Sequence, residues 1–217
     1  MSLAIFDLDN TLIGGDSDHS WGEFLCEKNI VDAHHYKHQN DQFYQDYQNG
    51  DLDMTAYVAF ALAPLRSLTV QQRDSLHSEF MATKIAPLQL PKAHTLIEKH
   101  RQQGDTLLII TATNRFITGP IAELLGIPHL LATEPEVVDG EFTGSIVGAP
   151  CFQEGKVTQL NTWLATHKQS MAGSFFYSDS FNDLPLLEKV SYPFAVDPDD
   201  KLRAYAEDHN WPIISLR

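Results

Sequence analysis

Apolar residues follow two different spacings along this chain, and the change of spacing divides it into two kinds of segment. Between residues 16 and about 86 they recur every three or four residues, as on one face of an α-helix. Elsewhere, short continuous apolar runs alternate with further helical stretches. Such runs are typical of strands buried on both faces of a parallel sheet, so the sequence predicts an α/β fold.

The apolar runs predict the strands of a doubly wound, Rossmann-like parallel sheet. They cover residues 3–6, 106–110, 174–178 and 192–196. Helical spacing between and after them predicts helices at 91–104, 116–125, 155–167 and from about residue 182. An antiparallel hairpin is expected at 137–142, because its central Asp139-Gly140 can supply the positive φ angles of a type I′ turn.

The helical segment is expected to be an insertion after the first strand. Residues that favour helix N-termini precede its apolar faces: Asp16 or Ser17, Asp32, Asp53 and Thr69. Gly14-Gly15, just before this segment, is suited to a hinge. We therefore expect two domains, an α/β core made of residues 1–14 and 87–217 and an all-helical cap made of residues 15–86.

Aromatic residues recur along these helices at helical spacing. The second helix carries Tyr36, Phe43, Tyr44 and Tyr47. A stripe of this kind lines either the interior of a helical bundle or a binding site for a cofactor, and periodicity alone favours the interior. We expect these side chains to pack in the core of the cap.

Charge and composition narrow the classes of function. The net charge of −14 leaves no basic stripe for phosphate backbones, which argues against nucleic acid as a partner. No stretch approaches the roughly 18 apolar residues that a membrane-spanning helix needs. Cys26 and Cys151 form no spaced set, so we expect reduced thiols and a cytoplasmic protein. An anionic substrate would need local cations, since the acidic surface repels it at long range.

The densest group of candidate chemical residues follows the first strand. Asp7 and Asp9 come at its end, and Asn10 and Thr11 come next. Ligands of parallel sheets bind beyond the carboxyl ends of the strands, so both carboxylates can approach one centre there. The alternative is a helix N-cap provided by Asp9 or Asn10, which accounts for one acid and not for the set.

Polar residues stand at corresponding places later in the chain. Thr111 follows the apolar run LLII, and Asp179 follows FFYS, with Asn182 and Asp183 close behind. Lys156 lies in the first turn of a predicted helix, where its charge opposes the helix dipole unless it faces an anion. This local cost favours a functional role for the lysine.

Taken in order, these elements resemble the motifs of the haloacid dehalogenase superfamily, which here are DLDNT at 7–11, Thr111, Lys156 and DSFND at 179–183. With the helical insertion and the EFTG segment of the hairpin, the chain is similar to the subgroup that contains phosphoserine phosphatases. Within that subgroup it looks closest to the histidinol-phosphate phosphatases. The resemblance implies a Mg²⁺-dependent phosphomonoester hydrolase that forms an aspartyl phosphate.

The resemblance also implies which residues carry the reaction. Asp7 would attack phosphorus and become the aspartyl phosphate. Asp9 would protonate the leaving alkoxide and then activate the water that cleaves the intermediate. Mg²⁺ prefers a few carboxylates with water and phosphate oxygens, which suits Asp7, Asp179 and the main-chain carbonyl of Asp9.

Other motif residues would bind or support the phosphoryl group. Its oxygens would be held by Asn10, Thr11, Thr111 and Lys156. Behind them, Asn182 and Asp183 would hold Lys156 or a metal-bound water in place. The partner implied by this set is a small phosphomonoester.

The residues after the first motif bear on the substrate. In phosphoserine phosphatases an acid at this point binds the substrate ammonium group, and Asp16 falls there, followed by Asp18 and His19. The cap arginine that grips the substrate carboxylate in that subgroup has no counterpart in MTAYVAFALAPL, which precedes Arg66. The resemblance therefore favours histidinol phosphate over phosphoserine. The helix dipole explains acids at a helix N-terminus equally well.

Other functions stay open at this point. A phosphate-binding module would not need a general acid, whereas transfer of the phosphoryl group to another alcohol would use the same residues. His34, His35 and His38 have a spacing that metal ligands can share, but no third ligand or cysteine pair accompanies them for a structural zinc site. The sequence leaves the oligomeric state open.

Overall fold

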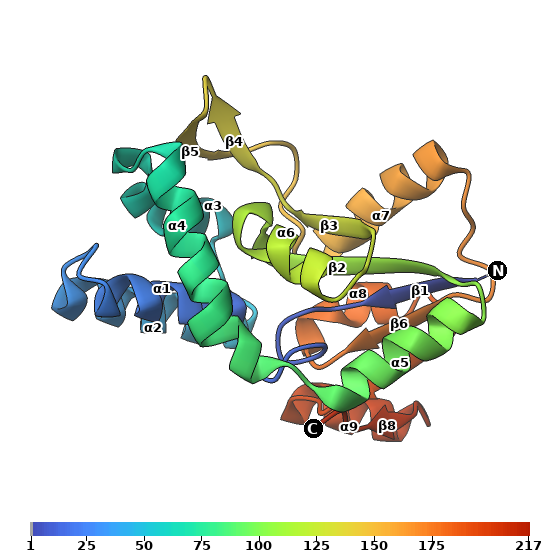
Figure 1. Cartoon of the computed structure of the whole chain (residues 1–217). Coiled ribbons are helices and arrows are strands. Elements are labelled where there is room, and N and C mark those ends of the chain that lie inside the picture. The colour runs from blue at the N-terminus through green and yellow to red at the C-terminus, as the bar shows by residue number, and fades with distance from the viewer. Residues whose placement is uncertain (1) are drawn as a thin grey trace.

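The central element of the fold is a sheet of six parallel strands. A computed structural model describes residues 2–217, and the strands lie in the order β3-β2-β1-β6-β7-β8. Their bounds are Leu3–Phe6 (β1), Thr106–Asn114 (β2), His129–Thr133 (β3), Phe175–Ser178 (β6), Tyr192–Val196 (β7) and Ile213–Ile214 (β8). Figure 1 shows this sheet with helices packed around it.

Helices cover both faces of the sheet, which confirms the predicted doubly wound α/β fold. Ala4 and Phe6 of β1 face a core cluster shared with α5 (Pro91–Gln102) and α6 (Arg115–Leu124). Leu3 and Ile5 face a second cluster, shared with α7 (Glu154–His167), α8 (Leu184–Leu187) and α9 (Asp200–Asp208). The whole of β1 is buried, because successive side chains of a strand point to opposite faces and both faces are covered.

The chain reverses direction across the sheet at β1. It runs from β1 outward to β2 and β3, then returns to β6 on the other side and continues to β7 and β8. In doubly wound sheets such a reversal opens a crevice beyond the carboxyl ends of the two central strands. Asp7 follows β1 and Asp179 follows β6, so both lie at this crevice.

The segment between β1 and α5 is helical, as predicted. It forms α1 (Ser17–Glu27), α2 (Ala33–Asn49), α3 (Met54–Leu62) and α4 (Val70–Phe80), with 3₁₀ turns at Ala63–Ser67 and Ala86–Leu88 and a π-helical turn at Met81–Ile85. Each helix has a predicted N-cap that accepts a hydrogen bond from its first turn, namely Asp16, Asp32, Asp53 and Thr69. In Figure 1 these helices gather at one end of the sheet. Their division from the core as a cap domain of residues 15–86 stays our proposal.

Aromatic side chains connect this helical segment to the core. Trp21 of α1 and Phe80 at the end of α4 are buried and pack edge to face, with ring centroids 5.0 Å apart. Trp21 also packs against Phe116 of α6, at 5.5 Å between centroids. Pairs of this geometry add about 0.5–1.5 kcal/mol each beyond the burial of apolar area. The helical segment is therefore held by buried rings and not by its connecting loops alone.

The predicted hairpin is formed by β4 (Pro135–Val138) and β5 (Glu141–Ile146). Asp139 and Gly140 at its tip have φ angles of 52° and 83°, the positive values that a type I′ turn requires. Arg73 of α4 donates to the Gly140 carbonyl oxygen over 2.8 Å, and its guanidinium lies 5.1 Å from the centroid of the Phe142 ring. These contacts bind the hairpin to the helical segment.

The sheet is larger than the sequence predicted. β2 does not end at Ile110 but runs to Asn114, and β3, β8 and α9 are missing from the prediction. The added part of β2 passes through an irregularity of the register and pairs with β3 again at Asn114, opposite Thr133. The helix predicted from residue 182 is only a 3₁₀ turn, Phe181–Asp183, followed by the short helix α8. The missed strands β3 and β8 are short, and their conformation depends on pairing with strands elsewhere in the chain.

None of the helices within residues 2–217 combines the length and the apolar character needed to cross a membrane. The longest of the α-helices, α2, has 17 residues, many of them polar and exposed. The cytoplasmic location and the exclusion of nucleic acid as a partner stay predictions.

Candidate active site

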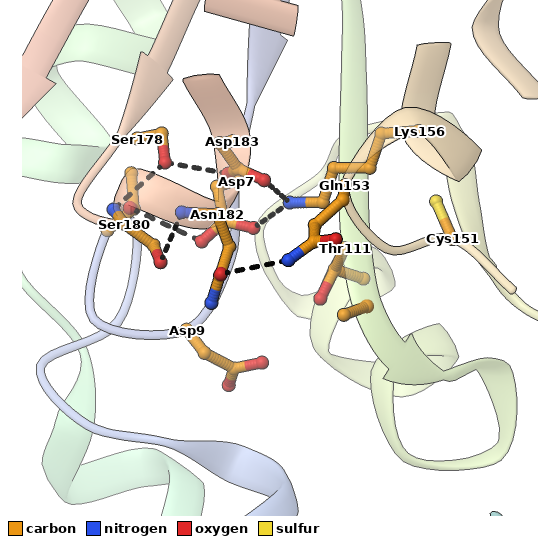
Figure 2. A network of polar contacts seen from close by, with 12 residues as sticks. Asp7, Asp9, Thr111, Cys151, Gln153, Lys156, Ser178, Ser180, Asn182 and Asp183 are labelled. Carbon is orange, nitrogen blue, oxygen red and sulfur yellow. Dashed lines mark hydrogen bonds and ion pairs between the residues drawn. The ribbon is translucent and has the colours of Figure 1, made fainter. Parts of the chain in front are cut away.

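A buried lysine connects acids from two loops at the crevice. Lys156 Nζ lies 2.8 Å from Asp7 Oδ1 and 2.6 Å from Asp183 Oδ1 (Figure 2). The lysine comes from the first turn of α7, and its side chain is 1% exposed. Burial alone would lower the pKa of Lys156, but the two carboxylates raise it above its ordinary value, so the ammonium stays charged. Two anions thus offset the cost of a lysine at a helix N-terminus.

Thr11 connects the loops that follow β1 and β6. Its hydroxyl oxygen lies 3.4 Å from Asp7 Oδ2 and 3.0 Å from Asp179 Oδ1, and it accepts from the main-chain N–H of Asp179 at 3.1 Å. The loop can close in this way because Asn10 adopts a left-handed φ of 57°, which asparagine tolerates. The buried Thr11 side chain therefore positions two carboxylates. Its contact with phosphate stays a prediction.

Asp9 is held apart from the lysine by two donors. The main-chain N–H of Ser17 donates to Oδ1 over 2.6 Å, and the Thr113 hydroxyl donates to Oδ2 over 2.8 Å. Figure 2 shows this carboxylate separate from the ion pairs of Lys156. Burial, and then the charge of Asp16, raise the pKa of Asp9 to about 7. The site therefore contains a carboxyl group that can exchange a proton near neutral pH.

The crevice holds more negative than positive charge. Burial raises the pKa of Asp7 to about 7, with Lys156 opposing the shift and Asp183 adding to it. Burial, and then the charge of Asp7, raise the pKa of Asp179 well above its ordinary value. Among residues 2–217, Lys156 is the only basic side chain in an ion pair with any of these acids. The site can therefore accept a further cation.

The donor set fits Mg²⁺. Within the described part of the chain, no group of three or more His, Cys, Asp or Glu side chains is arranged to hold a metal ion. Mg²⁺, however, is usually bound by one or two carboxylates, with water and phosphate oxygens completing its coordination. Asp7 and Asp179 provide two such carboxylates, both bonded to the Thr11 hydroxyl. Binding of Mg²⁺ there stays a proposal.

A pocket opens beside Asp7 and Asp9 and is walled by the helical segment. Its lining combines acids with aromatic side chains, namely Asp7, Asp9, Asp16, Asp18, Phe43, Tyr44, Tyr47 and Tyr57. No lysine or arginine is among the described residues that line it. Acids and aromatic faces both attract cations, so this lining suits a cationic group that carries a flat or apolar part.

The cap residues predicted to meet the substrate all line this pocket. Asp16 also caps α1, accepting from the main-chain N–H of His19 at 2.7 Å. His19 Nε2 lies 2.8 Å from Asp41 Oδ1, which fixes the imidazole ring. Burial raises the pKa of Asp18 well above its ordinary value, and its Oδ1 is buried with no hydrogen-bond partner among the described residues. Asp18 therefore offers an acceptor that a ligand could satisfy.

The aromatic face of α2 is interior packing only in part, so the prediction is confirmed for Tyr36, which is buried and stacks on Phe60 of α3, and is wrong for the later rings. Tyr36 is buried, but Phe43, Tyr44 and Tyr47 are half-buried and line the pocket. Helical periodicity shows that side chains share a face, but it does not show whether protein or ligand covers that face. The part of the stripe formed by Phe43, Tyr44 and Tyr47 therefore belongs to the site.

Two further predicted phosphate ligands, Thr111 and Asn10, also lie at the crevice. Thr111 lines the pocket with a buried hydroxyl, whose oxygen accepts from the main-chain N–H of Thr113 at 3.2 Å. The half-buried Asn10 donates its main-chain N–H to the Gly15 carbonyl oxygen over 2.9 Å. Their contact with a phosphoryl group stays a prediction.

The structure adds positioning residues that the sequence did not reveal. Ser178, the last residue of β6, donates its hydroxyl to Asp183 Oδ2 over 2.6 Å. Gln153, directly before α7, reaches the same crevice (Figure 2). Thr113 could have been found, because it shares a strand face with Thr111, two residues earlier, once β2 is known to continue. No comparable pattern marks Ser178 or Gln153.

Comparisons with known proteins agree with this geometry. Residues 4–188 match the haloacid dehalogenase-like hydrolase family. A histidinol-phosphatase of Neisseria meningitidis is 46% identical over 220 aligned residues, which cover 100% of this chain and 99% of that protein. A protein of unknown function from Bordetella pertussis Tohama I is 40% identical with a TM-score of 0.93, over 100% of this chain and 99% of that one. A substrate-bound phosphoserine phosphatase has a TM-score of 0.72 at 15% identity, over 100% and 93% of the two chains, and shares the fold.

The family match begins within β1 and ends after the loop that carries Asp179 and Asp183, so it includes every motif that forms the crevice. The similarity to the Neisseria protein extends over the helical segment as well. The chain therefore belongs to the haloacid dehalogenase-like hydrolase family, and it is a phosphatase of that family.

Proposed function

We propose that this protein hydrolyses a small cationic phosphomonoester, histidinol phosphate, through an aspartyl phosphate on Asp7 and with Mg²⁺ bound. The observation that carries the proposal is the pocket beside Asp7, which is lined by acids and aromatic rings and by no described lysine or arginine. The full-length similarity to a Neisseria histidinol-phosphatase supports the same substrate.

Asp7 is the nucleophile in this proposal. Its carboxylate attacks phosphorus, an Asp7 O–P bond forms, and the bond from phosphorus to the ester oxygen breaks. Lys156, bonded to Asp7 Oδ1 at 2.8 Å, favours the ionised carboxylate against burial, which otherwise raises its pKa. Asp183, which accepts from the Ser178 hydroxyl, holds the lysine in turn, so its charge also remains close to the phosphoryl oxygens.

Asp9 is the general acid and then the general base. With a pKa raised to about 7, it can hold a proton at neutral pH and give it to the departing alkoxide. In the second step it takes a proton from water, which attacks phosphorus and breaks the Asp7 O–P bond to release phosphate. The hydrogen bonds from Ser17 and Thr113 keep the carboxyl group in one orientation through both steps.

Asp7, Asp179 and the main-chain carbonyl of Asp9 are the groups that would hold Mg²⁺. Bound there, the ion would neutralise negative charge on the phosphoryl group. Thr11 keeps the two carboxylates side by side. The crowding of acids around a single lysine supports this assignment, because a further cation relieves their repulsion.

Mg²⁺ is expected to raise the unfolding temperature of the wild type at pH 8 by about 5–10 °C when present at a hundredfold excess over its Kd. Asp179→Asn should remove most of that rise. Without Mg²⁺ the same variant should unfold at a higher temperature than the wild type. The reason is the sign of the pKa shift: a carboxyl whose pKa is raised on folding costs stability when it is ionised. Differential scanning calorimetry with and without Mg²⁺ measures both effects.

Asp74→Asn is the control for this experiment, since it removes the charge of an exposed acid on α4. Its unfolding temperature should respond to Mg²⁺ as that of the wild type does. A full Mg²⁺ response in Asp179→Asn would contradict the assignment of Asp179 as a ligand.

Histidinol phosphate is expected to have a kcat/KM at least about tenfold above that of phosphoserine, or roughly 1.4 kcal/mol. The pocket offers acids to an ammonium or imidazolium group, but no lysine or arginine among its described lining residues to a carboxylate. A carboxylate left without a partner costs several kcal/mol on burial. Arg66, the nearest arginine after α3, is exposed beside Gly144 of β5 and does not line the pocket. Phosphate release from a panel of phosphomonoesters with Mg²⁺ measures the preference.

A pair of matched variants tests the origin of that preference. Asp16 and Asp53 are both N-caps, of α1 and α3, but only Asp16 lines the pocket. Asparagine caps a helix as well as aspartate, so both replacements remove a charge and keep the cap. Asp16→Asn should raise the KM for histidinol phosphate more than the KM for a phosphomonoester whose alcohol part is uncharged, and Asp53→Asn should change neither KM. Phosphoserine as the better substrate would overturn the proposed substrate and leave the phosphatase reaction standing.

A further inference from the structure

The C-terminal end of α2 is tied to the catalytic face by two side-chain amides. Asn182 donates from Nδ2 to the Tyr47 carbonyl oxygen over 2.8 Å, and Gln153 donates from Nε2 to the Gly50 carbonyl oxygen over 3.1 Å. Gln153 Nε2 also lies 3.4 Å from Asn182 Oδ1, and Figure 2 marks this contact with a dashed line. The two amides therefore orient each other while each bonds a main-chain carbonyl of the helix end.

These amides belong to the loops that position the ion pair. Gln153 precedes α7, and its carbonyl oxygen accepts from the main-chain N–H of Lys156 at 3.0 Å. Asn182 is the residue before Asp183, which bonds Lys156. A movement of the α2 end away from the core would thus have to break bonds to the same two loops that hold Lys156.

The end of α2 is also a wall of the pocket. Tyr44 and Tyr47 come from its last turns and line the pocket beside Asp7. The Tyr47 ring packs against the Phe152 ring, with centroids 5.7 Å apart, so the loop before α7 touches α2 through a ring as well as an amide. The bonds from Gln153 and Asn182 to the end of α2 therefore fix the distance between this wall and Asp7.

The backbone at both sides of this contact is specialised for close approach. Gly50 ends α2 with a φ of 86°, and a Cβ on it would lie 3.2 Å from Asn182 Oδ1 and 3.5 Å from Gln153 Nε2. Gln153 has a φ of 48° and a ψ of −121°, a conformation that glycine adopts readily and other residues adopt at a cost. Because glycine would adopt this backbone conformation at a lower cost, the presence of glutamine indicates that its side-chain amide has a role.

We propose that Gln153 and Asn182 form a latch that holds the C-terminal end of α2 over the substrate, so that Tyr44 and Tyr47 are positioned on the leaving group by the loops that position Lys156 and Asp183. Gln153 is a positioning residue in this scheme. The latch rests on the phosphatase reaction at Asp7 and not on the identity of the substrate. Its loss leaves the groups around the phosphoryl site in place and displaces only the wall that meets the leaving group.

The test uses Gln153→Ala and Gln153→Gly, with Gln159→Ala as the matched control. Gln159 lies on α7 and donates its amide to the Ala149 carbonyl oxygen over 2.9 Å, the same kind of bond without a contact to α2. Amide hydrogen exchange of residues 43–52 reports on the α2 end. Initial rates with p-nitrophenyl phosphate and with acetyl phosphate compare an aromatic leaving group, which reaches the wall, with a small one.

Both Gln153 variants should speed the exchange of residues 43–52 and lower kcat/KM for p-nitrophenyl phosphate about five- to tenfold, with less than twofold change for acetyl phosphate. Gln153→Gly should unfold at a temperature no lower than that of Gln153→Ala, because it relieves the backbone, and should still show the kinetic loss. The proposal is overturned if exchange and rates match those of Gln159→Ala, or if both substrates lose equally. A failure of histidinol phosphate as substrate would leave these outcomes unchanged.

Discussion

Asp7→Asn is expected to lower phosphatase turnover by at least about 10⁴-fold without unfolding the protein. An amide oxygen is a far weaker nucleophile than a carboxylate, so the aspartyl phosphate cannot form. The side chain keeps its size, and Lys156 keeps Asp183 as a partner at 2.6 Å, so no buried charge is left alone. Rates of phosphate release with histidinol phosphate and with p-nitrophenyl phosphate measure the loss.

The stability of Asp7→Asn separates loss of chemistry from loss of fold. Burial raises the pKa of Asp7 to about 7, above the ordinary value of 3.8. Asp7 therefore binds its proton more tightly in the folded than in the unfolded protein. At a pH above both pKa values the carboxyl group is ionised, and its burial then lowers the stability of the fold. At pH 8 without Mg²⁺ the variant should unfold at a temperature no lower than that of the wild type.

Mass spectrometry after acid quenching provides the control. Wild-type protein quenched during turnover should carry a phosphoryl group on the peptide that contains Asp7, and the variant should carry none. Asp74→Asn makes the same replacement at an exposed site on α4 and should keep both turnover and label. Turnover near the wild-type rate in Asp7→Asn would exclude Asp7 as nucleophile.

The sequence predicts the centre of this fold well because the central strands are buried on both faces. β1 is apolar throughout, and Asp7 stands out at its end. The reversal of strand order at β1 then brings Asp179 to the same edge. Continuous apolar runs and polar strand ends are local patterns, and local patterns can be identified without knowing what pairs with them.

The outer parts of the sheet are harder to predict because their partners are distant. After Ile110, β2 continues through Thr111 and Thr113, which resemble a loop in the sequence, and its pairing with β3 resumes only at Asn114. The same missing extension hides Thr113, whose hydroxyl holds Asp9. Strand propensity depends strongly on such context, so a single sequence cannot decide it.

The sequence predicts the acidic residues of the pocket, but it does not predict the aromatic side chains that form its walls. Asp16 caps a helix that starts near the motif and Asp18 lies in its first turn, so their position follows from sequence order. The rings of α2 lie on a helix face, and tertiary packing decides whether protein or ligand covers that face. Gln153, which bonds Gly50 at the end of α2, is 103 residues away from it in the sequence. Contacts at that separation leave no periodic signal.

Asp9→Asn is expected to slow the first chemical step for histidinol phosphate by about 10²- to 10⁴-fold and to leave that step nearly unchanged for p-nitrophenyl phosphate. An alkoxide needs a proton to leave, whereas a nitrophenolate departs as an anion. Asparagine fits the position, because its carbonyl oxygen can accept from Ser17 N–H while its amide donates to the Thr113 hydroxyl oxygen. The loss therefore reports on proton transfer and not on a disturbed loop.

Burst kinetics and the pH profile make this prediction decisive. Without the base, the aspartyl phosphate breaks down slowly, so Asp9→Asn should give a rapid burst of nitrophenol followed by slow turnover. Burial, followed by Asp16, raises the pKa of Asp9 to about 7, so its proton is present below that pH and lost above it. In the wild type the first step with histidinol phosphate should therefore slow as the pH rises above about 7, and this limb should be absent in the variant. If Asp9→Asn slows the reaction equally with both substrates and gives no burst, Asp9 does not transfer a proton and only binds Ser17 and Thr113.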